Sequence, residues 1–307
     1  MSSTVSSSVL GDRMSKQFTT NPLVSVVLLS YNYDQFLRES LESIFGQSYQ
    51  NFELIVIDDG STDRSPEIIE EYARQYPEKM TILNRQENWG VSSTYNQALR
   101  YVSGNIFVGF SSDDVMPPDA LEKRARYFRE HPDVDMLATD FDVIDAEGAI
   151  HTGDAKLDVC PQFRRYFQVD FDNLYSELLQ GNFLPDPTIT VSLKRIQKHE
   201  LRYDENCPLL SDWDLWLRMA RHYRWAYLPE STVHYRWHGE NLSWPQGSPK
   251  NEAALNAQRI YILAKALTKN QTPDHRRLIL QRLASLCDRS ITQDLQPQDT
   301  QNAPDEQ

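Results

Sequence analysis

Short apolar runs that alternate with amphipathic segments constrain the fold of this chain more than any other feature. Four runs have the length and continuity of strands that are covered on both faces in a parallel sheet. They are residues 23–30, 54–57, 80–84 and 105–110. Segments with apolar residues at helical spacing separate these runs, at residues 33–47, 65–76 and 91–102. The alternation predicts an α/β fold in which helices flank a mostly parallel sheet, with Ser65 as the N-cap of the second helix.

Two of these predicted strands end in adjacent aspartates. Asp58 and Asp59 follow the second run, and Asp113 and Asp114 follow the fourth run after two serines. If the two strands are near each other, the four carboxylates meet at the edge where open α/β sheets bind ligands. Carboxylates in one crevice raise one another's pKa unless a cation or hydrogen-bond donors compensate. The pattern predicts one pair for a nucleotide and the other for its Mn²⁺ or Mg²⁺. An ordinary Asx-type turn after each strand is the alternative.

Composition excludes several functional classes. A chain of 307 residues with 40% hydrophobic content can build a large core, as one large domain or two smaller ones. A formal net charge of -13 argues against general binding of nucleic acids, which normally requires a basic face. Cys160, Cys207 and Cys287 are far apart and lack metal-ligand spacing, so we expect a reducing cytoplasm and no zinc site. No apolar stretch has the length of a transmembrane helix.

Five ordered motifs extend the pattern over residues 22–245. They are "PLVSVVLLSYN", "FELIVIDDGSTDRS", "NWGVSSTYNQAL", "GNIFVGFSSDDVMPPDAL" and "SDWDLWLRMA". Together they resemble glycosyltransferase family 2, whose members are inverting enzymes with the GT-A fold. The resemblance implies a nucleotide-sugar half at about residues 22–130 and an acceptor half at about residues 131–245.

We expect different structure on either side of this region. Residues 1–21 and 296–307 are polar and predict flexible or disordered tails. Residues 246–295 predict a helical extension of two amphipathic helices that packs against the catalytic core. Their apolar stripes are expected to contain Ile260, Leu263, Ala264 and Leu267 in one helix and Leu278, Ile279, Leu283 and Leu286 in the other. Dimerisation and docking to a membrane-bound acceptor are alternatives for this extension.

The resemblance assigns a nucleotide-base pocket to the end of the first strand. Ser30, Tyr31 and Asn32 match the segment that holds the base in the family, and Tyr31 is placed to stack on it. Asp58 and Asp59 match a pair of which one hydrogen-bonds the base or the ribose.

The resemblance also implies a metal and diphosphate site after the fourth strand. Asp114 matches the metal ligand of the "DxD" region, and Asp113 matches the contact to ribose or phosphate. Ser111 stands where many members have a further acid. Downstream, His238 matches a residue that contacts the metal or the diphosphate, and Arg236 is placed to neutralise diphosphate charge.

Asp212 matches the catalytic base of the family, with Ser211 in place of the usual glutamate. The implied reaction is a single displacement in which Asp212 accepts the proton of an acceptor hydroxyl and the anomeric configuration inverts. Asp212 and Asp214 also lie in the first turn of a predicted helix, where acids favour the helix dipole whatever their function. Trp213 is expected either to stack on a sugar or to pack in the core.

The implied substrates are a nucleoside-diphosphate sugar, with UDP as the family's commonest carrier, and a glycan, lipid-linked or other hydroxyl acceptor. This implies cell-surface polysaccharide or glycan synthesis by a cytoplasmic enzyme, with peripheral contact at the inner face of the membrane and a homodimer left open. Because Ser111 and Ser211 replace common acids, a catalytically silent nucleotide-sugar binding protein is the alternative. A nicotinamide-linked oxidoreductase would need a glycine-rich turn after the first strand, where this chain has "SYNYDQF".

Overall fold

The computed structural model describes residues 21–238, 241, 249–269 and 271–294. The chain divides into two compact units, Met1–Trp244 and Pro245–Gln307. The predicted tails, apart from residue 21, lie outside the described residues.

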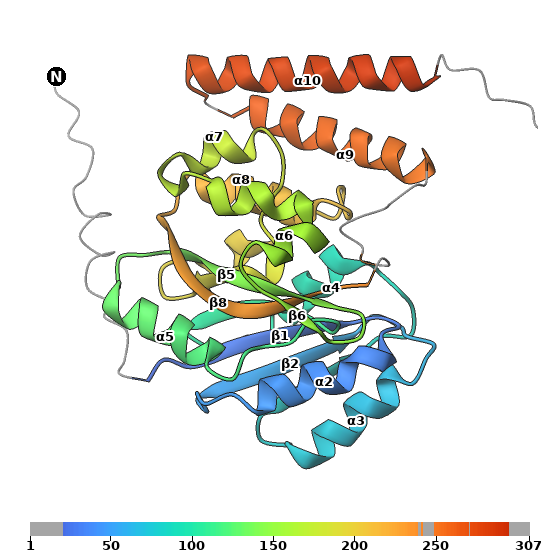
Figure 1. Cartoon of the computed structure of the whole chain (residues 1–307), viewed down its shortest axis with the longest axis vertical. Helices are drawn as coiled ribbons and strands as arrows, with labels where there is room; N and C mark the ends of the chain where they lie inside the picture. Colours follow the sequence, from blue (N-terminus) through green and yellow to red (C-terminus); the bar gives the residue numbers. More distant parts are fainter. Residues whose placement is uncertain (1–20, 239–240, 242–248, 270, 295–307) are drawn as a thin grey trace, which may run out of the picture. The chain divides into compact units, whose positions relative to one another are not determined.

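Within the described residues, eight strands of the first unit form one mixed sheet (Figure 1). The strands are β1 (Val24–Ser30), β2 (Phe52–Asp58), β3 (Met80–Asn84), β4 (Ile106–Ser111), β5 (Met136–Asp145), β6 (Ile150–His151), β7 (Ile189–Ser192) and β8 (Trp225–Trp237). Their order is β3-β2-β1-β4-β7-β5-β6, and β8 pairs with β5. The first four strands are parallel to one another, whereas β7 runs antiparallel to both β4 and β5. The predicted α/β fold with a mostly parallel sheet is confirmed.

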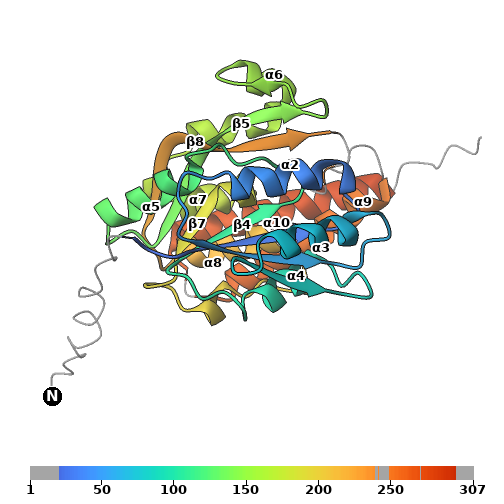
Figure 2. The same ribbon diagram turned by 90° about the horizontal axis from the view of Figure 1, so that it is seen from below.

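Helices cover both faces of the parallel part of the sheet. The helices of the first unit are α2 (Asp34–Phe45), α3 (Ser65–Gln75), α4 (Val91–Ala98), α5 (Ala120–Glu130), α6 (Ala155–Val159), α7 (Leu174–Leu178) and α8 (Ser211–Ala220). Helices α2 and α3 pack together, while α4 packs against β1 and β2. Figure 2 shows α2 on one side of these strands and α4 on the other. This double coverage explains why β1 and β2 are apolar without alternation.

Several predicted helix ends differ from the structure, and the predicted cap of α3 is wrong. Helix α3 already includes Ser65, and its N-cap position is Arg64, which makes no side-chain cap bond. The Asp63 carboxylate accepts a hydrogen bond from the Ser65 backbone N–H at 2.9 Å. Helix α4 ends at Ala98 rather than at residue 102. Past this end, backbone N–H groups bond to the carbonyl three residues earlier instead of four, as in a 3₁₀ turn. An example is the hydrogen bond from the Tyr101 N–H to the Ala98 carbonyl at 2.9 Å.

The second unit contains α9 (Pro249–Leu267) and α10 (Pro273–Asp294), which pack against each other. The prediction of two helices in this region is therefore confirmed. Leu263 and Ile279 are buried as expected, but Ala264 is exposed and Ile262 is buried in its place. No helix that the structure describes combines the length and the apolar character needed to cross a bilayer.

Candidate active site

The two aspartate pairs lie at the same edge of the sheet. Strand β1 pairs in parallel with β2 on one side and with β4 on the other. In this register Ser30 is opposite Asp58 and Leu29 is opposite Ser111, so β2 and β4 end at the same level. The expectation that the two strands are near each other is confirmed.

The carboxylates after β2 are paired with donors from their own surroundings. Asp58 accepts hydrogen bonds from the backbone N–H and the hydroxyl of Ser61, at 2.8 and 2.6 Å. Asp59 forms an ion pair with Arg85 at 3.2 Å and accepts from the backbone N–H groups of residues 89–90 at 3.0 and 2.9 Å. The charge at the end of β2 is therefore compensated within the chain.

The segment after β1 lies beside this pair. Ser30 is buried, whereas the Tyr31 side chain is 42% exposed. Asn32 adopts a positive φ of 53°, and its side-chain carbonyl accepts a hydrogen bond from the backbone N–H of Thr62 at 2.8 Å. Its own backbone N–H donates to the Ser61 hydroxyl at 2.9 Å. The turn formed by Asn32 and Ser61 lies next to the exposed Tyr31 in the sequence. Stacking of Tyr31 on a base remains a prediction.

The carboxylates after β4 have fewer donors. Asp114 is 1% exposed, and its Oδ1 accepts a hydrogen bond from the Arg236 backbone N–H at 2.8 Å. Its Oδ2 is buried and has no hydrogen-bond partner in the described part of the chain. Burial, together with the charge of Asp113, raises the pKa of Asp114 well above its usual range. His238 lies with Nε2 3.2 Å from Asp113 Oδ2, so the structure pairs this predicted metal ligand with Asp113.

Arg236 holds the loop after β4 that contains Asp113 and Asp114, which we call the aspartate loop. Its guanidinium donates from Nε to the Asp113 carbonyl at 2.7 Å and from Nη1 to the Asp145 carbonyl at 3.1 Å, and it forms an ion pair with Glu39. The residue is 1% exposed. In this arrangement Arg236 positions the loop, and its contact with a diphosphate remains a prediction.

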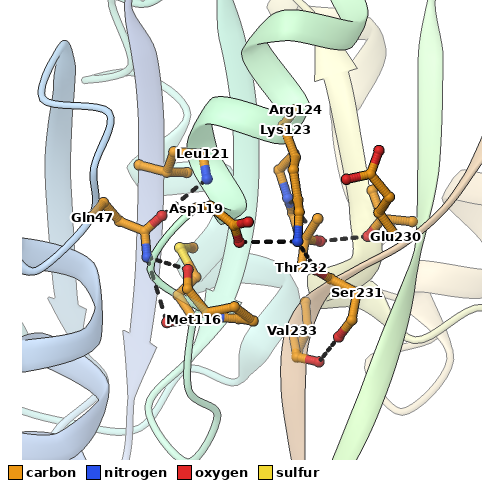
Figure 3. Close-up of polar contacts among 12 residues, drawn as sticks. Gln47, Met116, Asp119, Leu121, Lys123, Arg124, Glu230, Ser231, Thr232 and Val233 are labelled. Atoms are coloured by element: carbon orange, nitrogen blue, oxygen red, sulfur yellow. Dashed lines mark hydrogen bonds and ion pairs between the residues drawn. The ribbon is translucent and has the colours of Figure 1, made fainter. Parts of the chain in front are cut away.

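Helix α5, which follows the aspartate loop, is fixed by buried polar side chains (Figure 3). Gln47 Oε1 accepts a hydrogen bond from the Leu121 N–H at 3.0 Å, which satisfies a free donor of the first helical turn. Arg124 is fully buried and donates to the Thr232 hydroxyl at 2.7 Å and to the Pro187 carbonyl at 2.8 Å. Burial lowers the pKa of Arg124 to about 9. These contacts hold α5, β8 and the segment before β7 together, next to the loop after β4.

The predicted base, Asp212, lies in the first turn of α8. Its Oδ2 accepts a hydrogen bond from Asn182 Nδ2 at 2.7 Å, and its Oδ1 accepts from the Trp213 backbone N–H at 2.7 Å. Burial raises the pKa of Asp212 to about 6, although part of the residue stays open to solvent. A carboxylate with this pKa is suited to accept a proton near neutral pH.

The neighbours of Asp212 in α8 have structural contacts. Asp214 is buried and forms an ion pair with Arg218 at 2.8 Å. Trp213 is 2% exposed, and its Nε1 donates to the Leu178 carbonyl at 2.8 Å. Trp213 therefore packs in the core, and the sugar-stacking alternative is wrong.

The segment "GNFLPDPT" is expected from the sequence to contribute acceptor contacts, but the sequence assigns no role to Asn182 or Asp186 within it. Asn182 from this segment holds Asp212, and Asp186 accepts hydrogen bonds from the hydroxyls of Tyr95 at 2.8 Å and Tyr203 at 3.4 Å. Burial, together with the charge of Asp212, raises the pKa of Asp186 to about 7. The only signal in the sequence was one acid between two prolines, which is also typical of an ordinary turn.

The described residues include no group of three or more histidine, cysteine, aspartate or glutamate side chains arranged to hold a metal ion. The unpaired, buried Oδ2 of Asp114 nevertheless fits a hard cation that takes its other ligands from phosphate oxygens.

Solved structures share this fold. The crystal structure of S. aureus TarS 1-349 in complex with UDP-GlcNAc aligns with a TM-score of 0.63 at 20% identity, covering 88% of this chain and 72% of that one. The mannosyltransferase PcManGT from Pyrobaculum calidifontis, in complex with GDP-Man and Mn²⁺, aligns with a TM-score of 0.56 at 18% identity, covering 92% and 80%. At these identities the likeness shows the GT-A type of fold.

Sequence comparison identifies the family. The minor teichoic acid biosynthesis protein GgaB of Bacillus subtilis is 28% identical over 236 residues, which cover 76% of this chain and 25% of GgaB. The family model described as "Glycosyl transferase family 2" matches residues 25–184, just over half of the chain and both aspartate pairs. The chain belongs to glycosyl transferase family 2.

Proposed function

We propose that this family 2 glycosyltransferase moves a sugar from a nucleoside-diphosphate donor, a UDP-sugar in the first instance, to a hydroxyl acceptor with inversion of the anomeric centre. Asp212 is the general base. The acceptor class is a glycan or lipid-linked saccharide of cell-surface polysaccharide synthesis, which the similarity to a teichoic acid biosynthesis protein supports. The proposal includes a cytoplasmic location and leaves open a homodimer and contact with the membrane surface.

The state of Asp212 is the observation that carries this proposal. Its carboxylate is held by Asn182 and remains partly open, and its pKa of about 6 favours the ionised form at neutral pH. The hydrogen bond from Asn182 fixes the orientation of the carboxylate, so that one oxygen lone pair can accept the proton of an attacking hydroxyl. A residue serving only the helix dipole needs neither the raised pKa nor the oriented amide.

The other end of the reaction lies at the loop after β4. When Mn²⁺ or Mg²⁺ is bound, it supplies positive charge to a departing nucleoside diphosphate. Asp114 is proposed to hold this ion through Oδ2, and His238 contributes either to the ion or to the orientation of Asp113, its partner in the structure. Arg236 keeps the loop in place through its bonds to the backbone of Asp113 and the side chain of Asp114.

The nucleotide is proposed to lie against the ends of β1 and β2. Tyr31 stacks on the base, while Ser30 and Asn32 shape the pocket. Asp58 or Asp59 binds the base or ribose through lone pairs that their internal donors leave available, because an ionised carboxylate has about four acceptor positions.

The test is a panel of nucleotides followed by a rate measurement. Thermal unfolding of the full chain is recorded with UDP, GDP, dTDP and their sugar conjugates, each with and without Mn²⁺. A ligand that binds only the folded state raises the melting temperature with its occupancy. Release of the nucleoside diphosphate from the best donor is then followed with and without saccharide acceptors.

The silent-binder alternative makes a different prediction in the same experiment. It gives stabilisation by a sugar nucleotide but no release of diphosphate by the wild-type chain under any acceptor condition. Absence of stabilisation by every nucleotide would contradict both functions.

A further inference from the structure

A carboxyl group to which the family resemblance assigned no role lies between the two ends of the proposed reaction. Asp186 lies beside Gly109 of β4, the strand that leads to Asp114. It comes from the same segment as Asn182, which donates a hydrogen bond to Asp212. Asp186 is therefore placed near both the strand that carries the proposed cation ligand and the proposed base, and the charge of Asp212 contributes to its raised pKa. Asp186 keeps part of its surface open, whereas Asp114 is 1% exposed and its Oδ2 has no hydrogen-bond partner among the described residues.

The surroundings of Asp186 are built to hold a carboxyl group in one orientation. Tyr95 and Tyr203 stack with ring centroids 4.6 Å apart and an interplanar angle of 11°, and each points its hydroxyl at a different oxygen of Asp186. Gly109 in β4 makes room for this arrangement. A Cβ at this position would lie 2.8 Å from the Tyr95 hydroxyl and 3.0 Å from Asp186 Oδ2.

None of the contacts described for Asp186 neutralises its charge with a cation. Its two tyrosine bonds use one acceptor position on each oxygen, and an ionised carboxylate has about four. A structural acid would normally be paired with a cation or with several backbone donors when it is this strongly desolvated. Asp186 thus has spare acceptor capacity, and part of the residue is open to solvent.

The chemistry of a single displacement determines what must occupy this space. The anomeric carbon lies between the diphosphate that leaves and the hydroxyl that the base activates. We therefore expect the sugar ring of the donor to extend from the loop after β4 toward Asp212, past the segment that carries Asn182 and Asp186. Hydroxyl groups are the polar groups that such a ring presents, and a carboxylate binds them by accepting their protons.

We infer that Asp186 binds the hydroxyl groups of the donor sugar and is a specificity-determining residue for that sugar. Tyr95 and Tyr203 orient the Asp186 carboxyl group, and Gly109 admits it beside β4. The inference rests on the proposed function, because it requires a nucleotide sugar in this site.

The test separates the sugar from the nucleotide. Isothermal titration calorimetry in the presence of Mn²⁺ measures the affinity of the full chain for two pairs of probes, UDP with UDP-GlcNAc and GDP with GDP-mannose. For the pair that wild type binds better, Asp186→Ala is expected to weaken binding of the sugar nucleotide about tenfold, the usual consequence of a lost hydrogen bond to a charged group. Binding of the bare diphosphate should change by less than about twofold, since the residue contacts only the sugar.

Two further variants keep the result interpretable. Asp186→Asn nearly preserves shape and should shift the same affinity ratio in the same direction, which covers the case in which the alanine variant folds poorly. Asp214→Asn is the matched control, because it also neutralises a buried aspartate near the base but one that is paired with Arg218. It should leave the ratio unchanged.

The outcomes distinguish a failure of the role of Asp186 from a failure of the proposed function. Equal weakening of the sugar nucleotide and the bare diphosphate, or no weakening of either, would overturn the role of Asp186 and leave the proposed function intact. If the wild-type chain binds neither pair of probes, the proposed function fails for these donors and the role of Asp186 fails with it.

Discussion

The carboxylates at the end of β2 and those around the end of β4 lie at one edge of the same sheet, yet their surroundings differ. Asp59 has a cation and two backbone N–H groups within hydrogen-bond distance. Asp114 receives one backbone hydrogen bond and has a buried oxygen without a partner among the described residues. Asp186 and Asp212, which come from the later half of the catalytic domain, also have raised pKa values, mainly because of burial.

The difference teaches that adjacent acids in a sequence do not by themselves define a cation site. The pair after β2 is compensated within the chain and organises the turn that follows it. The acids on the β4 side are desolvated, and the described residues give their ionised forms few donors, so positive charge or hydroxyl protons from a ligand would stabilise those ionised forms. Five predictions test this contrast, beginning with the largest effect.

Asp212→Asn should lower turnover by about 10²-fold to 10⁴-fold, the usual contribution of a positioned general base. The affinity for the donor should stay nearly unchanged, because the base contacts the acceptor hydroxyl rather than the nucleotide. The rate of diphosphate release at saturating donor and a calorimetric titration give the two quantities. Full turnover in this variant would remove Asp212 from the mechanism.

Asp59→Asn and Asp114→Asn should affect the protein without ligands in different ways. The first change breaks the ion pair with buried Arg85 and should lower the free energy of unfolding by about 1 to 3 kcal/mol. The second change should cost less, because the oxygen that it alters has no partner to lose, but it should abolish the additional stabilisation that Mn²⁺ gives to a bound nucleoside diphosphate. Urea unfolding of the free protein and melting curves with and without Mn²⁺ measure both effects. Equal destabilisation of the two variants would contradict the proposed difference between the environments of Asp59 and Asp114.

The pH dependence of the rate should report the environment of Asp212. Because its pKa is raised to about 6 and the ionised form is the base, turnover should fall about tenfold per unit as the pH drops below 6. Asn182 and Asp186 face this carboxylate from the segment before β7. Replacing Asp186 with Asn should leave the midpoint of the rate profile nearly unchanged, because Asp186, with a pKa of about 7, still carries its proton at the pH where Asp212 titrates. A profile that is flat between pH 5 and 8 would contradict the assignment of the base.

The raised pKa values of the buried acids should also make the free energy of unfolding depend on pH. An acid with a folded-state pKa above its unfolded value keeps its proton longer in the folded state, so its contribution to stability decreases as the pH rises from about 4 to 7. Asp186→Asn should therefore be more stable than wild type at pH 7.5 and lose this advantage near pH 4. Urea unfolding at the two pH values measures the difference, and an advantage that is independent of pH would contradict the buried-acid interpretation.

The smallest expected effect concerns the base pocket. Tyr31→Ala should weaken nucleotide binding by about 1 kcal/mol in the absence of metal, the usual value of one aromatic stacking contact. Tyr101→Ala is the matched control, because Tyr101 is also an exposed tyrosine but follows α4 outside the proposed pocket. An equal loss of affinity in both variants would show that Tyr31 has no special role.

The sheet and its aspartate pairs could be predicted because their signals are local. Residues 54–57 are continuously apolar since β2 is covered on both faces, and parallel strands place their carboxyl ends together. The same reasoning placed Asp212 in a first helical turn. Periodicity carries this information because each residue's face follows from its position in the element.

The acceptor side could be predicted only in part, because its contacts depend on packing between distant segments. Asn182 and Asp212 are 30 residues apart, and Tyr95 and Asp186 are 91 residues apart. Neither pair has a spacing that a helix or strand would impose. Trp213 was ambiguous for the same reason, since an aromatic side chain suits both a core and a sugar, and only its burial decides between them.

The bond from the Arg236 backbone to Asp114 also has a consequence for the order of folding. The two residues are 122 positions apart in the sequence. Arg236 belongs to β8, the last strand of the first unit, which pairs with β5. Loop closure costs entropy that grows with the length of the loop, so contacts of this separation form after the local pairing of β1 with β2. We expect the site to become competent for ligands only when β8 has docked, late in synthesis, after the sheet that carries the nucleotide pocket has already formed.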